Sequence, residues 1–478
     1  MQALRRGWAG DLVCRVCTRD LLIPLLLVLL AAFTFFWRLG EGSLYDWDEA
    51  IHAQMAQEMI WRHDVLTPHQ GGTPHFTKPP LYQWQTLLAY KVFGVNEFAA
   101  RFWAALSGVG AVVMTCLLGR ELFDRPTGLG AALLLLIVSN LPYSHGYNFV
   151  SIGRMCMMTA PLTFYALLTL WLAWRGQRDR RYLVLIGLPV GAAVMTKNVA
   201  GLAPLGAVLV YWLLTWPLKA WPWRELGLAA LVAAAIILPW HASQALMHPH
   251  FIRDYLLYNV LQRAASTLDT QYHSQPAWFY LDVIRKGFSH AWVILPAAVA
   301  YAIYRIVGRR ERAPLLLIIW ALIPLTVYSL ARTKLAWYIL EVYPALALLG
   351  AWLLTRLVGR RWSLVAIVVF LAVAGWRPPS PRDGAPDVKR VAPLVSHLAA
   401  RDDLVLLCMR GDDLAARPAS LFYAGRAVEH VTFNGGALAR ACSKARYLLT
   451  DADTWQAAGL AGEVVCRSGT QLLVRFPP

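Results

Sequence analysis

The chain contains a long series of apolar stretches, each close to the length that an α-helix needs to cross a lipid bilayer. Hydrophobic residues make up 58% of the 478 residues and charged residues only 15%, which exceeds what a soluble core of this size holds. Because a bilayer interior cannot hydrogen-bond to exposed backbone, such stretches fold as helices. The sequence therefore predicts a multi-pass α-helical membrane protein.

Hydropathy predicts about eleven spanning helices. Their ranges are 20–39, 99–120, 127–143, 156–174, 182–197, 199–216, 226–243, 289–307, 313–331, 336–356 and 362–376. The fifth and sixth spans meet at Lys197, where one kinked element is an alternative to two helices. The first span follows Arg15 and Arg19 without an evident small-residue cleavage site, so we expect it to be a retained anchor.

The basic residues between the spans predict how the chain is oriented. If the N-terminal arginines are cytoplasmic, strict alternation places every basic cluster between spans on that same side. These clusters include Arg120 and Arg125, Arg175 to Arg181, Lys219 and Arg224, Arg305 to Arg312, and Arg356 to Arg361. The net charge of +17 thus follows from topology, and we predict no nucleic-acid partner. Two long loops, 40–98 and 244–288, and everything after residue 377 then lie outside.

Residues 377–478 have a different character from the apolar part, 1–376. After the Pro-rich linker WRPPSPRDGAP come the β-patterned runs DLVLLCM, AVEHVT, RYLLTD and QLLVRF, with a helical pattern from Asp387 to Ala400. We predict a small soluble α/β domain on the outer side. An oxidising compartment would allow one disulfide among Cys408, Cys442 and Cys466, and the sequence leaves the pairing open.

The stretch YDWDEAIHAQMAQEM, Tyr45 to Met59, begins a helix-patterned segment in the first outer loop. One interpretation is a capping box, in which Asp46 is the N-cap and Glu49 follows three residues later. That interpretation leaves Asp48 unexplained. Asp48 shares a helix face with His52, so a second interpretation makes it a general base. The segment alone leaves both interpretations open.

A second motif in this loop begins HFTKPPLYQWQTLLAYKVFG, with Lys78 directly before two prolines. The prolines hold the residue before them extended and present Lys78 on a defined backbone. The alternative role for this lysine is interfacial snorkelling. An acid, a cation and an amphipathic aromatic helix in one outer loop suit a lipid-phosphate substrate.

These two motifs, in this order, resemble the first outer loop of the bacterial lipid A aminoarabinose transferase family. More broadly, they are similar to the polyprenyl-phosphate-sugar-dependent glycosyltransferases of the GT-C fold. The later stretch RTKLAWYILEVYPALALLGAW is similar to another pattern of that family. The resemblance implies a GT-C membrane domain in the bacterial inner membrane, with the active site and the C-terminal domain on the periplasmic side. It further implies sugar transfer from undecaprenyl phosphate to lipid A or another acceptor on that side.

The resemblance also assigns site residues. It implies that Asp48 is the catalytic base and that Lys78 and Arg263 bind the phosphate of the sugar donor. The other predicted substrate-binding residues are Lys334, Tyr338, Glu49, His52, Tyr82 and Arg154. His52 is an alternative orienting group for Asp48, and Arg154 is alternatively an interfacial anchor.

Three positions depart from the family pattern. Thr77 stands where an acidic residue often precedes the lysine, and Asn259 stands where a histidine is common. Those two positions can hold a divalent metal in the family, so their replacement means that we do not predict that site here, and metal dependence stays open. Thr159 stands where a second acidic residue is usual, which puts a mechanism with two acids in doubt.

The predicted chemistry is a single displacement that inverts the anomeric centre. Lys78 and Arg263 would stabilise the leaving phosphate, and Asp48 would take the proton of the acceptor. The predicted spans carry few charges except near their ends, which favours chemistry at one face over passage through the bilayer. Two alternatives stay open: a protein O-glycosyltransferase of the same fold, and a transporter or flippase for a lipid-linked sugar.

Overall fold

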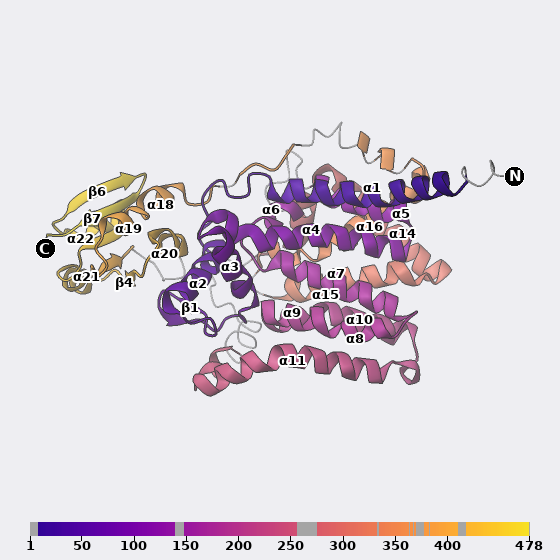
Figure 1. Ribbon diagram of the computed structural model, residues 1–478, viewed down its shortest axis with the longest axis horizontal. Coiled ribbons are helices and arrows are strands. Elements are labelled where there is room, and N and C mark those ends of the chain that lie inside the picture. The colour runs from indigo at the N-terminus through magenta and orange to yellow at the C-terminus, as the bar shows by residue number, and fades with distance from the viewer. Residues whose placement is uncertain are drawn as a thin grey trace.

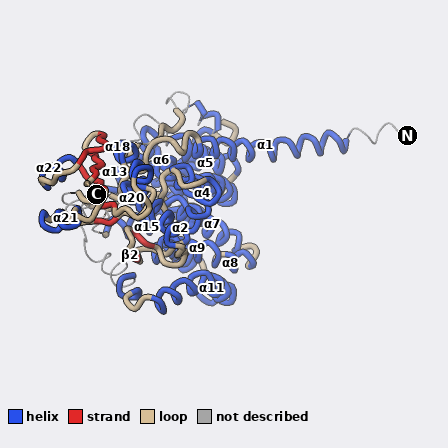
Figure 2. Tube along the Cα trace, turned by 60° about the vertical axis from the view of Figure 1, so that its left-hand side comes forward, coloured by secondary structure: helices blue, strands red, loops and turns tan. Residues whose placement is uncertain are grey.

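The computed structural model describes residues 8–138, 148–255, 275–331, 334–362, 364–366, 368–369, 377–381, 383–409 and 417–477. A bundle of long helices forms most of the molecule, and a sheet lies at the end of the bundle opposite the N-terminus (Figure 1). Seen from another side, the strands again gather at one end, and the first part of helix α1 extends past its neighbours (Figure 2).

Ten predicted spans coincide with helices of the bundle. The main helices are α1 (Trp8–Phe36), α4 (Glu97–Leu122), α5 (Arg125–Val138), α7 (Thr159–Gly176), α9 (Gly187–Lys197), α10 (Ala203–Thr215), α11 (Trp223–Met247), α14 (Ile294–Arg309), α15 (Arg312–Leu330) and α16 (Val342–Val358). Short elements join them: α6 (Phe149–Gly153), α8 (Arg181–Leu185), η1 (Asn198–Leu202), η2 (Leu218–Ala220), η4 (Ser289–Val293) and η5 (Ala336–Ile339). The eleventh predicted span, 362–376, lies mostly outside the described residues.

Length and composition support the membrane assignment. In the described part of the chain, five helical segments are long and apolar enough to cross a membrane, and three shorter apolar helices accompany them. Many large apolar side chains on these helices are exposed, including Leu213, Leu231 and Val307. A lipid environment accounts for such exposure, since water would disfavour it. The protein is a multi-pass membrane protein.

The chain reverses direction after Lys197, so the fifth and sixth spans are separate helices. Asn198 has φ 50°, and the 3-10 turn η1 folds back onto α9. A Cβ atom on Gly201 would lie 2.3 Å from the carbonyl carbon of Ala193, so only glycine allows this close return. The alternative of one kinked element is therefore wrong.

Ion pairs link several basic loops at the N-terminal end of the bundle. Arg175 pairs with Glu121 at 3.0 Å, which joins the ends of α7 and α4. Arg360, after α16, pairs with Asp124 at 3.1 Å. These loops lie together, as the alternation of spans predicts.

The opposite end carries the two outer loops. The first contains α2 (Asp48–Arg62), the antiparallel strands β1 (His69–Gln70) and β2 (Thr73–Pro74), and α3 (Leu81–Phe93). The described part of the second includes α13 (Phe279–Phe288). Residues 256–274 of that loop, including Arg263 and Asn259, lie outside the described residues.

The C-terminal region contains a five-stranded mixed sheet of order β4-β3-β5-β7-β6. Its strands are β3 (Val405–Leu407), β4 (Glu429–His430), β5 (Tyr447–Asp451), β6 (Glu463–Ser468) and β7 (Gln471–Arg475), and its helices are α18 (Pro386–Val391), α19 (Leu394–Leu398), α20 (Pro418–Ala424), α21 (Gly435–Cys442) and α22 (Ala452–Ala458). Strands β3, β4 and β5 run parallel, and β7 pairs antiparallel with β5 and β6. The four predicted strands are present, whereas β6 was not predicted. No disulfide joins cysteines within the described residues.

The C-terminal region packs on the first outer loop. One cluster of buried apolar residues includes Ala53 of α2, Val388 of α18 and Phe422 of α20. Polar contacts add to it, because Tyr423 accepts a hydrogen bond from the Leu44 N–H at 2.8 Å and donates one to Glu97 at 3.1 Å. The sheet is therefore anchored to the segment that leads into α2.

Candidate functional site

The capping box predicted at the start of α2 does not form. Trp47 occupies the N-cap position with φ 90°, and no side chain caps the helix. Asp46 instead accepts a hydrogen bond from the Ala419 N–H of α20 at 3.0 Å. The positive φ of Trp47 is an unfavourable conformation for a bulky residue, and neighbouring contacts must hold it. Asp48, the next residue, is half-buried at the first position of α2.

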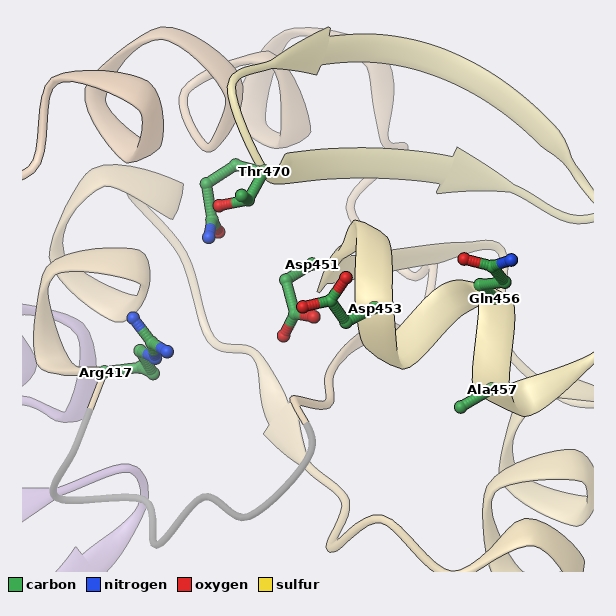
Figure 3. A pocket seen from close by; sticks show the side chains of 7 residues that line it. Arg417, Asp451, Asp453, Gln456, Ala457 and Thr470 are labelled. Carbon is green, nitrogen blue, oxygen red and sulfur yellow. The ribbon is translucent and has the colours of Figure 1, made fainter.

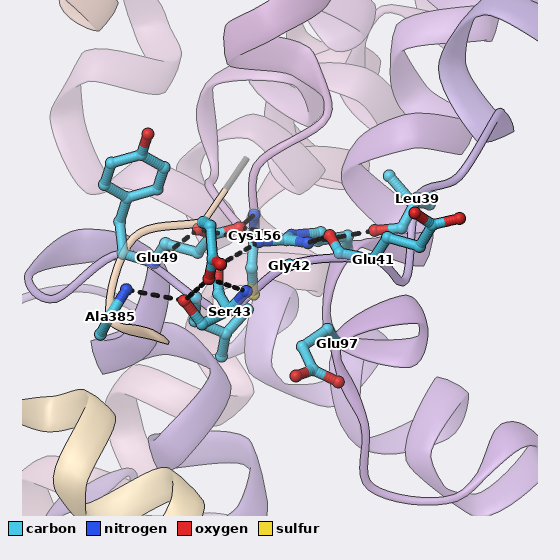
Figure 4. A network of polar contacts seen from close by, with 12 residues as sticks. Leu39, Glu41, Gly42, Ser43, Glu49, Glu97, Cys156 and Ala385 are labelled. Atoms are coloured by element: carbon cyan, nitrogen blue, oxygen red, sulfur yellow. Dashed lines mark hydrogen bonds and ion pairs between the residues drawn. The ribbon is translucent and has the colours of Figure 1, made fainter. Parts of the chain in front are cut away.

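Glu49 lies in a buried polar network next to Asp48 (Figure 4). Its carboxylate binds the Arg101 guanidinium at 2.8 Å and accepts hydrogen bonds from the N–H groups of Tyr45 and Cys156. Arg101 also donates to the carbonyl oxygens of residues 39, 41 and 43. Both oxygens of Glu49 thus already have partners, and the network fixes the chain that enters α2.

Asp48 is in contact with the tenth predicted span. The Trp337 indole N–H, in η5, donates to the Asp48 carboxylate at 3.1 Å. Trp337 directly precedes Tyr338, one of the predicted site residues. This contact joins the first outer loop to a segment almost three hundred residues later in the chain.

His52 lies one turn after Asp48 and is almost fully buried. Burial, the largest cause, and the nearby charges of Lys78, His75 and Lys197 together lower its pKa to about 3, while the charge of Asp48 acts to raise it. The imidazole is therefore neutral at ordinary pH. Its Nδ1 lies 3.4 Å from the Gln83 side-chain amide, and its ring meets Tyr82 edge-on at 5.7 Å between centroids.

The charged residues that shift the pKa of His52 come from three different segments of the chain. Asp48 comes from the start of α2, Lys78 from the turn before α3, and Lys197 from the end of α9. Lys78 is half-buried and directly precedes Pro79 and Pro80. The Asn198 side chain reaches the carbonyl oxygen of Thr77 at 3.4 Å, which connects the end of α9 to the KPP motif.

Lys197 is a site residue that the sequence interpretation used only as a boundary. Its side chain is buried, and its ammonium lies 4.7 Å from the ring centroid of Tyr338 and 5.9 Å from that of Tyr328. A lysine between two apolar runs is expensive in a bilayer and commonly marks a functional position. The position of Lys197 between two apolar runs could therefore have identified it from the sequence.

Other predicted residues make contacts outside this group. Arg154 donates to the carbonyl oxygens of Thr34 and Trp37 at 2.7 and 2.6 Å, at the end of α1. Lys334 donates to the Ala331 carbonyl oxygen at 2.7 Å. The contacts of Arg154 connect the segment after α6 to the end of the first span.

Of the two family metal positions, only Thr77 lies within the described residues, because Asn259 is outside them. Thr77 contacts the His75 imidazole at 2.5 Å. Among the described residues, no group of three His, Cys, Asp or Glu side chains has the geometry to hold a metal ion.

A polar hollow of about 630 Å³ lies in the C-terminal region, between Arg417, Asp451, Asp453 and the turn at Thr470 (Figure 3). Asp451 already accepts hydrogen bonds from the N–H and hydroxyl of Thr454, which begin α22. All residues that line the hollow belong to the C-terminal region, and none belongs to the group around His52.

Comparison with known proteins agrees with this architecture. The crystal structure of ArnT from Cupriavidus metallidurans bound to undecaprenyl phosphate superposes with a TM-score of 0.74 at 20% identity, over 94% of this chain and 97% of that one. An archaeal oligosaccharyltransferase, AglB from Archaeoglobus fulgidus, superposes with a TM-score of 0.55 at 13% identity, over 90% of this chain and 69% of that one. Residues 77–240 match the family model of dolichyl-phosphate-mannose-protein mannosyltransferases. The fold is thus that of the GT-C class of membrane proteins.

Sequence relatives narrow the class to a family. The chain is 32% identical over 363 residues to the undecaprenyl phosphate-alpha-4-amino-4-deoxy-L-arabinose arabinosyl transferase 1 of Pseudomonas fluorescens, covering 73% of this chain and 62% of that protein. The corresponding transferase of Pseudomonas aeruginosa is 32% identical over 336 residues, covering 67% and 58%. Over two thirds or more of its own length, the chain is similar to this family of aminoarabinose transferases. It spans about three fifths of the length of these curated relatives.

Proposed function

We propose that the protein transfers 4-amino-4-deoxy-L-arabinose from undecaprenyl phosphate to lipid A, at the periplasmic face of a bacterial inner membrane. The observation that carries the proposal is that the charges of Asp48 and Lys78 both act on the buried imidazole of His52, while Trp337 holds the Asp48 carboxylate at 3.1 Å. A carboxylate and an ammonium group at one site suit a reaction that needs a base and an anion-binding group. The names of the relatives supply the sugar and its lipid carrier.

Lys78 is the proposed partner of the phosphate in the sugar donor. Negative charge grows on this phosphate as the bond to the anomeric carbon breaks, and a fixed cation in a site with little water stabilises it. Lys197 adds a second positive charge near Tyr338. Arg263, outside the described residues, is proposed as a third on the family pattern alone.

Asp48 is the proposed base for the acceptor hydroxyl. The Trp337 indole N–H donates to one of its oxygens at 3.1 Å, which orients the carboxylate for its proposed role as proton acceptor. His52 is neutral, so its proposed role is to position the neighbouring groups without adding charge. Tyr82 and Tyr338 are proposed to line the same site, whereas Glu49 and Arg154 are proposed to hold the scaffold.

Asp48→Asn tests the catalytic role. We expect transfer by the purified protein to fall by about 100-fold or more, while binding of undecaprenyl phosphate stays at the wild-type level. Asp282→Asn is a matched control, because Asp282 is half-exposed on α13 and pairs with Arg285 and Lys286. Wild-type product formation by Asp48→Asn would remove Asp48 from the role of base.

A protein O-glycosyltransferase is the second candidate, because the matching family model describes protein mannosyltransferases. The acceptor can be decided by mass spectrometry of lipid A and of exported glycoproteins from cells with and without the gene. A sugar increment confined to glycoproteins would replace lipid A as the acceptor. Binding of the lipid-linked sugar without transfer to either acceptor would favour the flippase interpretation.

A further inference from the structure

Glu341 is a buried carboxylate for which the proposed chemistry has no role so far. It is 2% exposed and lies directly before α16, at the outer end of the tenth predicted span. Neither carboxylate oxygen has a hydrogen-bond partner among the described residues, and the side chain does not cap α16. Burying a carboxylate without hydrogen bonds is costly, so proteins rarely do so without a reason.

Glu341 belongs to the same charged group as the proposed site. It follows Tyr338 by three residues, and the ring of Tyr338 lies beneath the Lys197 ammonium. The charge of Lys197 acts both on Glu341 and on His52. Lys197 and Tyr338 thus connect Glu341 to the group that includes Asp48 and Lys78.

The charges of this group match the two ends of an amino-sugar donor. Such a donor carries an anionic phosphate at the anomeric carbon and, in the sugar named for the relatives, a cationic amine at the 4-position. These two positions lie at opposite ends of the sugar ring. Lys78 and Lys197 suit the phosphate, and a carboxylate whose oxygens have no described hydrogen-bond partner suits the ammonium.

We propose that Glu341 binds the ammonium group of the donor sugar and makes the enzyme selective for amino sugars over neutral sugars. This inference rests on the proposed function, because it assigns a part of the same substrate. A buried group that is paired only in the complex discriminates strongly, because an analogue without the amine leaves the carboxylate unpaired. Glu341 is in this sense a specificity-determining residue.

The test compares two donors with two variants. The donors are undecaprenyl phosphate carrying 4-amino-4-deoxy-L-arabinose and the same lipid carrying L-arabinose, which has a hydroxyl in place of the amine. In wild type we expect kcat/KM to favour the amino sugar by about 100-fold. Glu341→Gln should lose most of this preference, through a lower kcat/KM for the amino sugar and an unchanged or higher kcat/KM for arabinose. Glu225→Gln is the matched control at the other end of the bundle, where Glu225 lies near Arg180.

The outcomes distinguish a failure of the Glu341 assignment from a failure of the proposed transferase function. Equal losses with both donors in Glu341→Gln, or no change with either, would overturn the inference and leave the transferase activity standing. Wild-type protein that transfers neither sugar would instead overturn the proposed function. If Glu341→Gln does not fold, the kcat/KM values of the wild-type protein for the two donors still test the inference. Equal values would contradict a carboxylate that binds the amine.

Discussion

At the residue scale, the proposed site contains ionisable side chains that are buried or that follow a strained backbone. Asp48 follows a strained tryptophan and is held by an indole N–H. His52 is buried beside two lysines, and the carboxylate of Glu341 is buried without a described hydrogen-bond partner. Such environments are concentrated at functional sites, because folding stability alone does not favour them. Two predictions belong to this scale.

Lys78→Ala tests the phosphate assignment. We expect the KM for the sugar donor to rise and kcat to fall by about 100-fold, because the cation binds the phosphate in the ground state and more strongly in the transition state. Lys91→Ala is the matched control, since Lys91 is exposed on the last turn of α3. Steady-state kinetics with purified protein measure both constants. Wild-type kinetics in Lys78→Ala would defeat the assignment.

The pKa of His52 predicts a dependence of stability on pH. The pKa is about 3 in the folded protein against 6.5 ordinarily, so the unfolded state binds more protons between these values. Stability should therefore fall as pH falls from about 6.5, by about 2 kcal/mol at pH 5, and His52 should contribute no change above pH 7. His52→Gln should lose less stability than wild type between pH 7 and pH 5 in thermal unfolding. An identical loss in the two proteins would show that His52 does not carry this effect.

At the scale of elements, α2 is positioned by contacts at both of its sides. The Glu49 and Arg101 pair ties its first turn to α4, and α20 packs along it from the C-terminal region. Asp46 completes this arrangement by accepting a hydrogen bond from the first turn of α20. The orientation of Asp48 thus depends on elements far from it in sequence.

Arg101→Met should reduce stability strongly. The substitution leaves the Glu49 carboxylate buried without its counter-charge, which costs about 3 to 5 kcal/mol. Arg38→Met is the control, because Arg38 and Glu41 form a solvent-exposed pair whose loss should change stability little. Denaturant unfolding in detergent measures both changes. Losses of similar size would contradict the structural role of the buried network.

At the scale of the whole molecule, the C-terminal region and the bundle meet over the segment that carries the proposed base. Gly384 makes this contact close, because a Cβ atom there would lie 2.4 Å from the Tyr45 Cα. The backbone of Tyr45 cannot move away without disturbing the start of α2. The C-terminal region therefore acts on the site through its docking.

Gly384→Ala should loosen this docking. We expect a loss of about 1 to 3 kcal/mol in the stability of the contact, seen as faster proteolysis of the linker before α18, together with slower transfer. Gly436→Ala is the matched control in the same region, where an added Cβ would have no neighbour within 4 Å. Unchanged proteolysis and transfer in Gly384→Ala would contradict a positioning role for the docked region.

The sequence by itself determined the membrane architecture and part of the site. Ten spans were predictable because crossing a bilayer is a requirement on the length and polarity of a continuous stretch. The sequence also predicts that Asp48 and Lys78 belong to one site, because the same outer loop carries both. Four strands of the sheet followed from their local pattern, whereas β6 carries an exposed and irregular pattern that did not stand out.

Only the tertiary structure decided which distant side chains complete the site. Asp46 binds α20 across 373 positions of sequence, and Trp337 reaches Asp48 across 289. Lys197 and Glu341 join the same group from two further helices. The physical reason is that the local sequence reveals only that a charged residue in an apolar stretch is energetically unfavourable. Which side chain pairs with that charge depends on how the helices pack. Composition and periodicity therefore identify the unfavourable charge, whereas the packing of the bundle determines its partner.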